Sequence, residues 1–259
     1  NGSVFSVEEN ELVFPNEPIL RVEGTIIEAQ IVETLILNYL NFQSLIATKA
    51  ARIRNVAKDK IFADFGLRRA QGLGGIHASK AAVAGGADAT SNVLSGMLFD
   101  IEITGTQAHS WIQSFEDELT AFRKYAEVFP DKTILLVDTY DTLKSGVPNA
   151  IKVASELREK GHELQGIRLD SGDLAYLSKR SRAMLDNAGF ENVKIFASNE
   201  LDEYVIRSLD NQHAPIDGIG VGTQLVTGMA SASLDGVYKL ACANGKPRMK
   251  VSENVEKET

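Results

Sequence analysis

The sequence predicts an α/β protein whose parallel sheet closes into an irregular, TIM-like barrel of about seven strands, accompanied by part of a β-rich domain. From residue 57 onward, short apolar runs alternate with amphipathic segments of helical spacing, a pattern typical of parallel sheets. Polar residues follow nearly every apolar run. A barrel gathers all its strand ends on one face, whereas an open doubly wound sheet gathers only those near its switch point. The many polar ends therefore favour a barrel.

Composition narrows the class of protein. The chain has 259 residues, of which 44% are hydrophobic and 24% charged, as in ordinary globular proteins. No apolar run approaches the length of a membrane helix, and the net charge of −8 argues against a nucleic-acid groove. The single cysteine, Cys242, leaves no internal disulfide framework and fits a reducing compartment. We therefore expect a cytoplasmic protein without nucleic-acid or membrane partners.

The first 56 residues differ from the rest. Residues 1 to about 24 carry short apolar stretches with Pro15 and Pro18 and predict a few strands, and residues 25 to 56 predict one or two helices. We assign residues 1–56 to part of an N-terminal β-rich domain with its linking helices. The sequence begins at Asn1 without a methionine and ends in the polar run 252–259, so we expect it to be cut at both ends.

The alternating part, residues 57–235, is assigned to the barrel. Its candidate strands cover residues 61–65, 88–90, 101–104, 133–138, 164–169, 193–197 and 218–221. The clearest helix between them places Trp111, Phe115, Leu119, Phe122 and Ala126 on one face.

The run IRLDSGD at 167–173 is the most informative motif. Its first four residues alternate as in a strand, which places Arg168 and Asp170 on one face, and Asp173 then opens a helix that Gly189 closes. An arginine beside an aspartate at a strand end suits a substrate that is anionic and develops positive charge. An inward salt bridge followed by a capping aspartate is the alternative interpretation.

Two further strand ends suggest ligand contacts. Gly222 and Thr223, in the run GVGT, open a helix and can offer backbone N–H groups to a phosphate. Ser198 and Asn199, one strand earlier, can complete this cradle, and barrels often bind phosphate with their last two loops.

His109 and the segment 65–69 complete the candidate set. His109 follows the polar turn at Gly105 and Thr106, which favours a reactive imidazole over a simple helix cap. Phe65 offers an aromatic face, and Arg68 and Arg69 offer guanidinium groups for a carboxylate or phosphate, unless both are solvated. The few scattered histidines predict no zinc site.

Together these motifs resemble the nicotinate phosphoribosyltransferase family. The matching stretches, in the family's order, are DFGLRRAQG (64–72), GGADATSNVLSG (85–96), GTQAHS (105–110), LVDTYD (136–141), RLDSGDL (168–174) and VGTQLVT (221–227). The strand-rich start is similar to the family's sandwich domain, and residues 236–240 resemble its return, so 236–259 are assigned to that domain.

The resemblance implies a type II phosphoribosyltransferase. Such an enzyme transfers phosphoribosyl from 5-phosphoribosyl 1-pyrophosphate to nicotinate, giving nicotinate mononucleotide and pyrophosphate, and couples this to ATP hydrolysis. In the family the histidine that matches His109 is phosphorylated by ATP. The family works as a homodimer in which an N-terminal segment of the partner completes the active site, a segment that we expect to lie outside this sequence.

The same resemblance assigns roles to the candidate residues. Nicotinate would stack on Phe65, with Arg68 and Arg69 near its carboxylate or the phosphates. Ser91 matches a position where nicotinamide-using relatives carry an acidic residue, so it favours nicotinate. Thr106 is assigned to substrate binding.

The remaining roles concern the ribosyl donor. Asp170 and Asp138 would offset the positive charge on the ribose, and Arg168 with Mg²⁺ would counter the leaving pyrophosphate. The 5′-phosphate would rest on four residues, Ser198, Asn199, Gly222 and Thr223. The sequence does not identify metal ligands. Use of nicotinamide or quinolinate stays open, as does a ligand-binding fragment without turnover.

Overall fold

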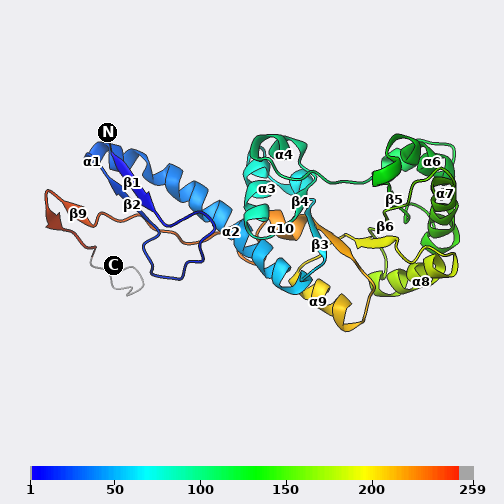
Figure 1. The fold of residues 1–259 in the computed structure, drawn as a ribbon. Helices are drawn as coiled ribbons and strands as arrows, with labels where there is room; N and C mark the ends of the chain where they lie inside the picture. The colour runs from blue at the N-terminus through cyan, green and yellow to red at the C-terminus, as the bar shows by residue number, and fades with distance from the viewer. Residues whose placement is uncertain (1, 251–259) are drawn as a thin grey trace. The chain divides into compact units, whose positions relative to one another are not determined.

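The computed structural model describes residues 2–250 (Figure 1). The chain divides into two compact units, one formed by Asn1–Leu45 with Ser231–Thr259 and the other by Ile46–Ala230. The sequence placed the corresponding boundaries at 56/57 and 235/236.

The first unit contains two small antiparallel sheets and helical segments. Strand β1 (Ser3–Ser6) pairs with β2 (Leu20–Glu23), and β9 (Cys242–Ala243) pairs with β10 (Lys246–Pro247). Helix α1 (Ile26–Ile31) starts with a capping box in which Thr25 and Glu28 exchange hydrogen bonds. Helix α2 (Glu33–Ala57) begins here and continues into the second unit. The segment after Gly236 returns to this unit, because Tyr238 Oη donates to the Ala29 carbonyl at 2.9 Å.

The second unit is built on six parallel strands in the order β4-β3-β8-β7-β6-β5. The strands are β3 (Ile61–Asp64), β4 (Ala89–Thr90), β5 (Ile134–Leu136), β6 (Gly166–Leu169), β7 (Lys194–Ala197) and β8 (Gly218–Val221). They form a curled half-barrel. Since all strands are parallel, their carboxyl ends lie along one edge of the sheet.

The predicted seventh strand at 101–104 is wrong. Only one residue pair, Thr90 with Ile103, forms a bridge there, flanked by Thr90 N to Glu102 O and Thr104 N to Thr90 O at 3.0 Å each. Within residues 2–250, β5 pairs with β6 alone. The segment ends its pairing after Thr104 because the chain turns into the polar run Gly105-Thr106-Gln107, whose side chains rather than its backbone reach the neighbouring strands.

Helices cover the outside of this sheet (Figure 1). They are α3 (Gly74–Ala84), α4 (Val93–Phe99), α5 (His109–Ile112), α6 (Glu118–Val128), α7 (Val147–Glu159), α8 (Leu174–Asn187), α9 (Glu203–Asn211) and α10 (Thr223–Val226), with single turns η1 (Leu67–Arg69), η2 (Pro130–Lys132) and the π-helical η3 (Thr142–Gly146). Asp173 caps α8 and Gly189 follows it at φ +78°, as the sequence predicts.

The helix predicted through Trp111 and Ala126 is wrong in its continuity, since α5 and α6 are separate. Asp117 accepts a hydrogen bond from Thr120 N at 2.8 Å and thereby starts α6 as a new helix. The Trp111 ring packs against Phe115 with centroids 4.7 Å apart, and across the break it packs against Tyr125 at 5.8 Å, a residue outside the predicted face.

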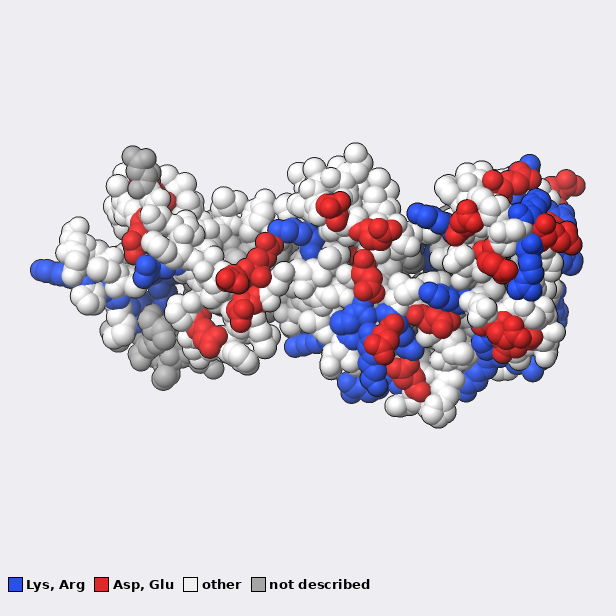
Figure 2. All heavy atoms as spheres, viewed as in Figure 1, with Lys and Arg blue, Asp and Glu red and all other residues white. Residues whose placement is uncertain are grey.

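The core of the second unit lies between the sheet and these helices. Its largest fully buried side chains are Phe62, Phe122, Ile46, Ile53, Ile112, Leu135, Leu136, Ile167, Leu169, Leu185, Ile195 and Leu201. Charged side chains of both signs are crowded over the α6–α8 end, whereas the surface over the outer end of α4 is largely uncharged (Figure 2). No helix in the described residues is long and apolar enough to cross a membrane.

A buried ion pair joins α2 to α9. Lys49 Nζ lies 2.6 Å from Glu203 Oε2, and the two side chains are only 4% and 10% exposed. Taking either partner away leaves a charge buried without compensation, which costs about 3–5 kcal/mol in comparable pairs.

Lys49→Met should therefore lower the free energy of unfolding by about 3–5 kcal/mol, as measured by denaturant titration. Lys124→Met, which removes the lysine from an exposed pair with Glu127, is the matched control and should change stability by less than about 1 kcal/mol. Equal small losses in both variants would show that the Lys49–Glu203 pair does not hold α2 against α9.

Candidate active site

Arg168 is the centre of a polar cluster at the carboxyl edge of the half-barrel. Its three nitrogen atoms donate in three directions: Nε to Ser198 Oγ, Nη1 to Thr106 Oγ1 and Nη2 to Asp170 Oδ1, each at 2.8 Å. Ser198 Oγ in turn donates to the same Asp170 oxygen. The parallel register explains the meeting, because Arg168 on β6 lies opposite Phe196 on β7, two residues before Ser198. The cluster therefore joins β6, the end of β7 and the loop before α5.

Asp138 forms the second half of the cluster. Its Oδ2 accepts from the Asp170 backbone N–H at 2.8 Å and from Ser171 Oγ at 2.5 Å. Its Oδ1 is buried and has no hydrogen-bond partner within residues 2–250. A buried carboxylate oxygen without a donor is costly, so this atom is a point where a ligand or cation would be stabilised.

His109 begins α5 and faces both carboxylates. Its Nε2 lies 3.5 Å from Asp170 Oδ2 and 3.9 Å from Asp138 Oδ1, while Nδ1 is 3.1 Å from Thr139 Oγ1. The side chain is 38% exposed. The imidazole is thus oriented by contacts on both nitrogens and remains accessible from solvent, as a reactive group must be.

The pKa of Asp170 lies below its usual value. Burial, the largest single influence, raises it, but the Arg168 charge, the hydrogen bonds from Ser198 and Arg168, and the nearby His109 together outweigh burial. The carboxylate is therefore held in its charged form.

The Arg168–Asp170 salt bridge and the Asp173 cap of the alternative interpretation are both present, but the salt bridge lies in a cluster that also contains Asp138 and His109.

Phe65 lies beside this cluster at the end of β3. The Arg168 guanidinium carbon is 5.1 Å from its ring centroid, within the range of a cation–π contact. Gly220 on β8 allows the ring to approach the strand closely, because a Cβ there would overlap the Phe65 ring atoms. Phe65, Thr106 and Arg168 line a cavity of about 30 Å³ that continues into the apolar inner face of the sheet.

Arg68, Arg69 and Ser91 flank the Phe65 end of the edge. Both arginines are exposed in η1, which matches the solvated alternative and leaves them available to a ligand. Ser91 is half-buried, and its N–H donates to the Asp64 carbonyl at 2.9 Å. This bond fixes Ser91 directly beside β3.

The residues of the predicted phosphate cradle follow strands β7 and β8. Gly222 and Thr223 are half-buried at the start of the four-residue α10, and Asn199 is exposed with φ +87°. The Ser198 hydroxyl, however, is engaged by Arg168 and Asp170. It therefore belongs to the central cluster in this structure, because its side chain points along the edge toward β6.

Three side chains of the site were missed by the sequence-based prediction. Thr139 contacts His109, and Ser171 contacts Asp138. Asp64 is fully buried and accepts from Gly66 N, Ser79 Oγ and Thr90 Oγ1 at 2.7–2.8 Å. An acid that ends an apolar strand was an available signal for Asp64, the same signal that identified Asp138.

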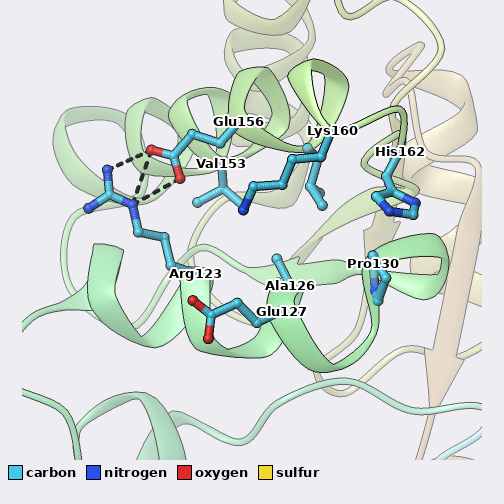
Figure 3. A pocket seen from close by; sticks show the side chains of 9 residues that line it. Arg123, Ala126, Glu127, Pro130, Val153, Glu156, Lys160 and His162 are labelled. Carbon is cyan, nitrogen blue, oxygen red and sulfur yellow. Dashed lines mark hydrogen bonds and ion pairs between the residues drawn. The ribbon is translucent and has the colours of Figure 1, made fainter.

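A groove of about 420 Å³ lies elsewhere in the second unit, between α6 and α7 (Figure 3). The Arg123–Glu156 ion pair lies at one end of it, and Lys160 and His162 lie toward the other. Residues of α6 and α7 form most of its lining, and none of the predicted site residues lines it. The predicted site residues therefore lie at the sheet edge and not in this groove.

Because its folded-state pKa is lowered, Asp170 contributes stability that is present above its unfolded pKa of about 3.9 and is lost as the pH falls through the folded value. Asp170→Asn should therefore unfold at a temperature below that of the wild type at pH 6, and the difference should shrink below about pH 4. Melting curves from pH 3 to 7 measure this. Asp173→Asn, an exposed cap in the same loop, is the control, and a difference for Asp170→Asn that is constant across the range would contradict the assignment.

Known proteins are similar in sequence to nearly the whole of this chain. No protein-family model matches the chain. The nicotinate phosphoribosyltransferase of Bacillus subtilis is 51% identical over 98% of this chain and 53% of its own length. The Caenorhabditis elegans protein of the same name is 39% identical over 100% of this chain and 57% of its own length.

Solved structures show the same fold. The crystal structure of human nicotinic acid phosphoribosyltransferase superposes with a TM-score of 0.86 and 34% identity, covering 96% of this chain and 59% of that one. A nicotinate-nucleotide pyrophosphorylase from Pyrococcus furiosus gives 0.77 and 31%, covering 87% and 58%. The chain spans about half the length of the curated relatives it matches, and over that span it belongs to the nicotinate phosphoribosyltransferase family.

Proposed function

We propose that this chain carries the barrel active site of an enzyme that transfers phosphoribosyl from 5-phosphoribosyl 1-pyrophosphate to nicotinate. The products are nicotinate mononucleotide and pyrophosphate. The observation that carries the proposal is the cluster of Arg168, Asp170, Asp138 and His109 at the strand ends, in a chain with these relatives.

The two carboxylates suit the charge that develops in this reaction. As pyrophosphate leaves, positive charge builds on the ribose, and fixed negative groups stabilise it at no cost of reorganisation. Asp170 is held charged by Arg168, and Asp138 presents an unpaired oxygen. Arg168 has five N–H groups, three of which make the bonds described above. The remaining two are proposed to bind the departing phosphates.

The acceptor is proposed to bind at the β3–β4 end of the edge. The Phe65 ring provides a flat apolar surface for the pyridine, and the exposed Arg68 and Arg69 provide positive charge for its carboxylate or for the donor's phosphates. Gly222 and Thr223, at the start of α10, are proposed to hold the 5′-phosphate with Asn199. Ser198 contributes through its bond to Arg168.

ATP and Mg²⁺ are proposed as the reaction's co-substrate and cofactor. Within residues 2–250, no group of three or more His, Cys, Asp and Glu side chains is arranged to hold a metal. Mg²⁺ is usually bound by one or two carboxylates together with substrate phosphates, and the unpartnered oxygen of Asp138, with Asp170 nearby, fits that arrangement. Bound there, Mg²⁺ would supply neutralising charge for the pyrophosphate.

A homodimer with a shared active site is also proposed, in the cytoplasm. The support is the outer face of α4, where Val93, Leu94, Met97 and Leu98 are 49–76% exposed. Exposed apolar patches of this kind mark interaction surfaces. The patch begins at Val93, the first residue of α4. It therefore directly follows the loop residues Ser91 and Asn92.

Nicotinate specificity is tested in the full-length protein with labelled donor. The wild type should form product with nicotinate and not with nicotinamide or quinolinate. Ser91→Asp should lower kcat/KM for nicotinate by at least tenfold, because a like charge at about 4 Å costs several kcal/mol at an effective dielectric near 20. Ser155→Asp, on the exposed face of α7, is the charge-matched control and should have no effect.

Equal losses of nicotinate and nicotinamide use in Ser91→Asp would remove Ser91 from the acceptor pocket. Wild-type turnover of nicotinamide or quinolinate instead would favour those substrates. A full-length protein that binds nicotinate but forms no product would favour the non-catalytic alternative.

His109 should accept phosphate from ATP, because a neutral imidazole is a competent nucleophile near pH 7. Full-length protein incubated with γ-³²P-ATP should acquire acid-labile label. His109→Ala should lose the label and the ATP-stimulated part of the activity while retaining some ATP-independent transfer. His162→Ala, in the loop between α7 and β6, should keep both. Label that survives acid, or that persists in His109→Ala, would contradict the assignment.

A further inference from the structure

Gln107 occupies the open side of the half-barrel, where a closing strand would lie. The segment between α4 and α5 crosses from the β4 side of the sheet to the β5 side (Figure 1). Within residues 2–250, its backbone pairs with no strand other than β4, through Thr90. Gln107 is 5% exposed, and its Oε1 accepts from the Leu136 backbone N–H on β5 at 3.1 Å.

The Leu136 N–H belongs to the unpaired side of β5. N–H groups of successive residues in a strand point to opposite sides, and Val137 N donates to Arg168 O on β6. Leu136 N therefore points away from β6, and Leu136 is only 1% exposed. A buried N–H without a partner is costly. Gln107 thus replaces the hydrogen bond that a seventh strand would have supplied.

Packing alone does not explain a glutamine at this position. Its Nε2 is buried and has no hydrogen-bond partner in the described part of the chain. A methionine of similar length would fill the space without burying that group. The carbonyl oxygen is the part of the side chain that makes a contact.

Gln107 also lies between two residues that attach the same loop to the site. Thr106 Oγ1 accepts from Arg168 on β6. His109 contacts Thr139, and its Nε2 faces Asp138 and Asp170. The loop is thus fixed at three points within four residues, and the Gln107 contact is the one that binds it to β5.

We propose that Gln107 is a positioning residue that closes the half-barrel through its side chain and holds His109 in line with Asp138 and Asp170. The expected loss of activity rests on the proposed function. The expected effects on the Leu136 amide and on His109 rest on the fold alone. It assigns no contact between Gln107 and substrate.

Three variants of the full-length protein test it. Gln107→Met removes the acceptor at similar length, and Gln107→Asn keeps the amide but shortens its reach. Gln107→Glu retains an oxygen that can accept from Leu136 N–H and should rescue part of the loss. Gln113→Met, at an exposed glutamine after α5, is the matched control.

Gln107→Met should speed hydrogen exchange of the Leu136 amide about fivefold to tenfold, the effect of losing one hydrogen bond. It should lower kcat by at least tenfold, because small displacements of reacting groups are costly. The KM for nicotinate should stay within about twofold, since Phe65 and Ser91 follow other strands, β3 and β4. The His109 imidazole resonances should shift, and Gln113→Met should change none of these values.

Unchanged exchange at Leu136 in both Gln107→Met and Gln107→Asn would overturn the proposal. So would faster exchange with unchanged His109 resonances and kcat, which would make Gln107 merely structural. If the wild type forms no nicotinate mononucleotide, the proposed function fails, while exchange and the His109 resonances still test the positioning role. The Asn variant provides the same readouts if the Met variant does not fold.

Discussion

The site depends on the placement of one guanidinium group at the carboxyl edge of a curled parallel sheet. Arg168 projects from β6 and donates hydrogen bonds to Ser198, Thr106 and Asp170. Without Arg168, Asp170 would be a partly buried carboxylate, and burial raises its pKa. With it, the carboxylate stays charged beside a second acid, Asp138, and both face the imidazole of His109. The order of the strands brings these groups together, because β5, β6 and β7 are consecutive neighbours.

On the open side of the sheet, side chains rather than a backbone ladder attach the crossing loop to the site. Six strands curl without a seventh to close them within the described residues. The loop that crosses this side carries Thr106, Gln107 and His109, and each is attached by its side chain rather than by a backbone ladder. Such attachments can be released individually, whereas a ladder is cooperative. A loop of this kind suits the role that we propose for His109, which is to accept phosphate from ATP.

Much of this could be predicted from the sequence where the signal is local. Period-two alternation placed Arg168 and Asp170 on one face, and helix-capping residues located the start and end of α8. The break between α5 and α6 was missed because Asp117 caps from within a continuous apolar pattern. The missing seventh strand, the Ser198 contacts and the roles of Thr139, Asp64 and Gln107 depend on which side chain meets which across the fold. Local periodicity contains no such information.

The central claim is that a charged Asp170, held by Arg168, opposes positive charge that develops in the transition state. The most direct measurement is kcat for nicotinate mononucleotide formation by the full-length Asp170→Asn enzyme, beside the affinities for nicotinate and the ribosyl donor. The substitution keeps size and hydrogen bonding but removes the charge. We expect kcat to fall by well over tenfold while both affinities change by less than about threefold. A kcat within threefold of the wild type, in a variant that folds normally, would contradict the account and make Asp170 a structural partner of Arg168.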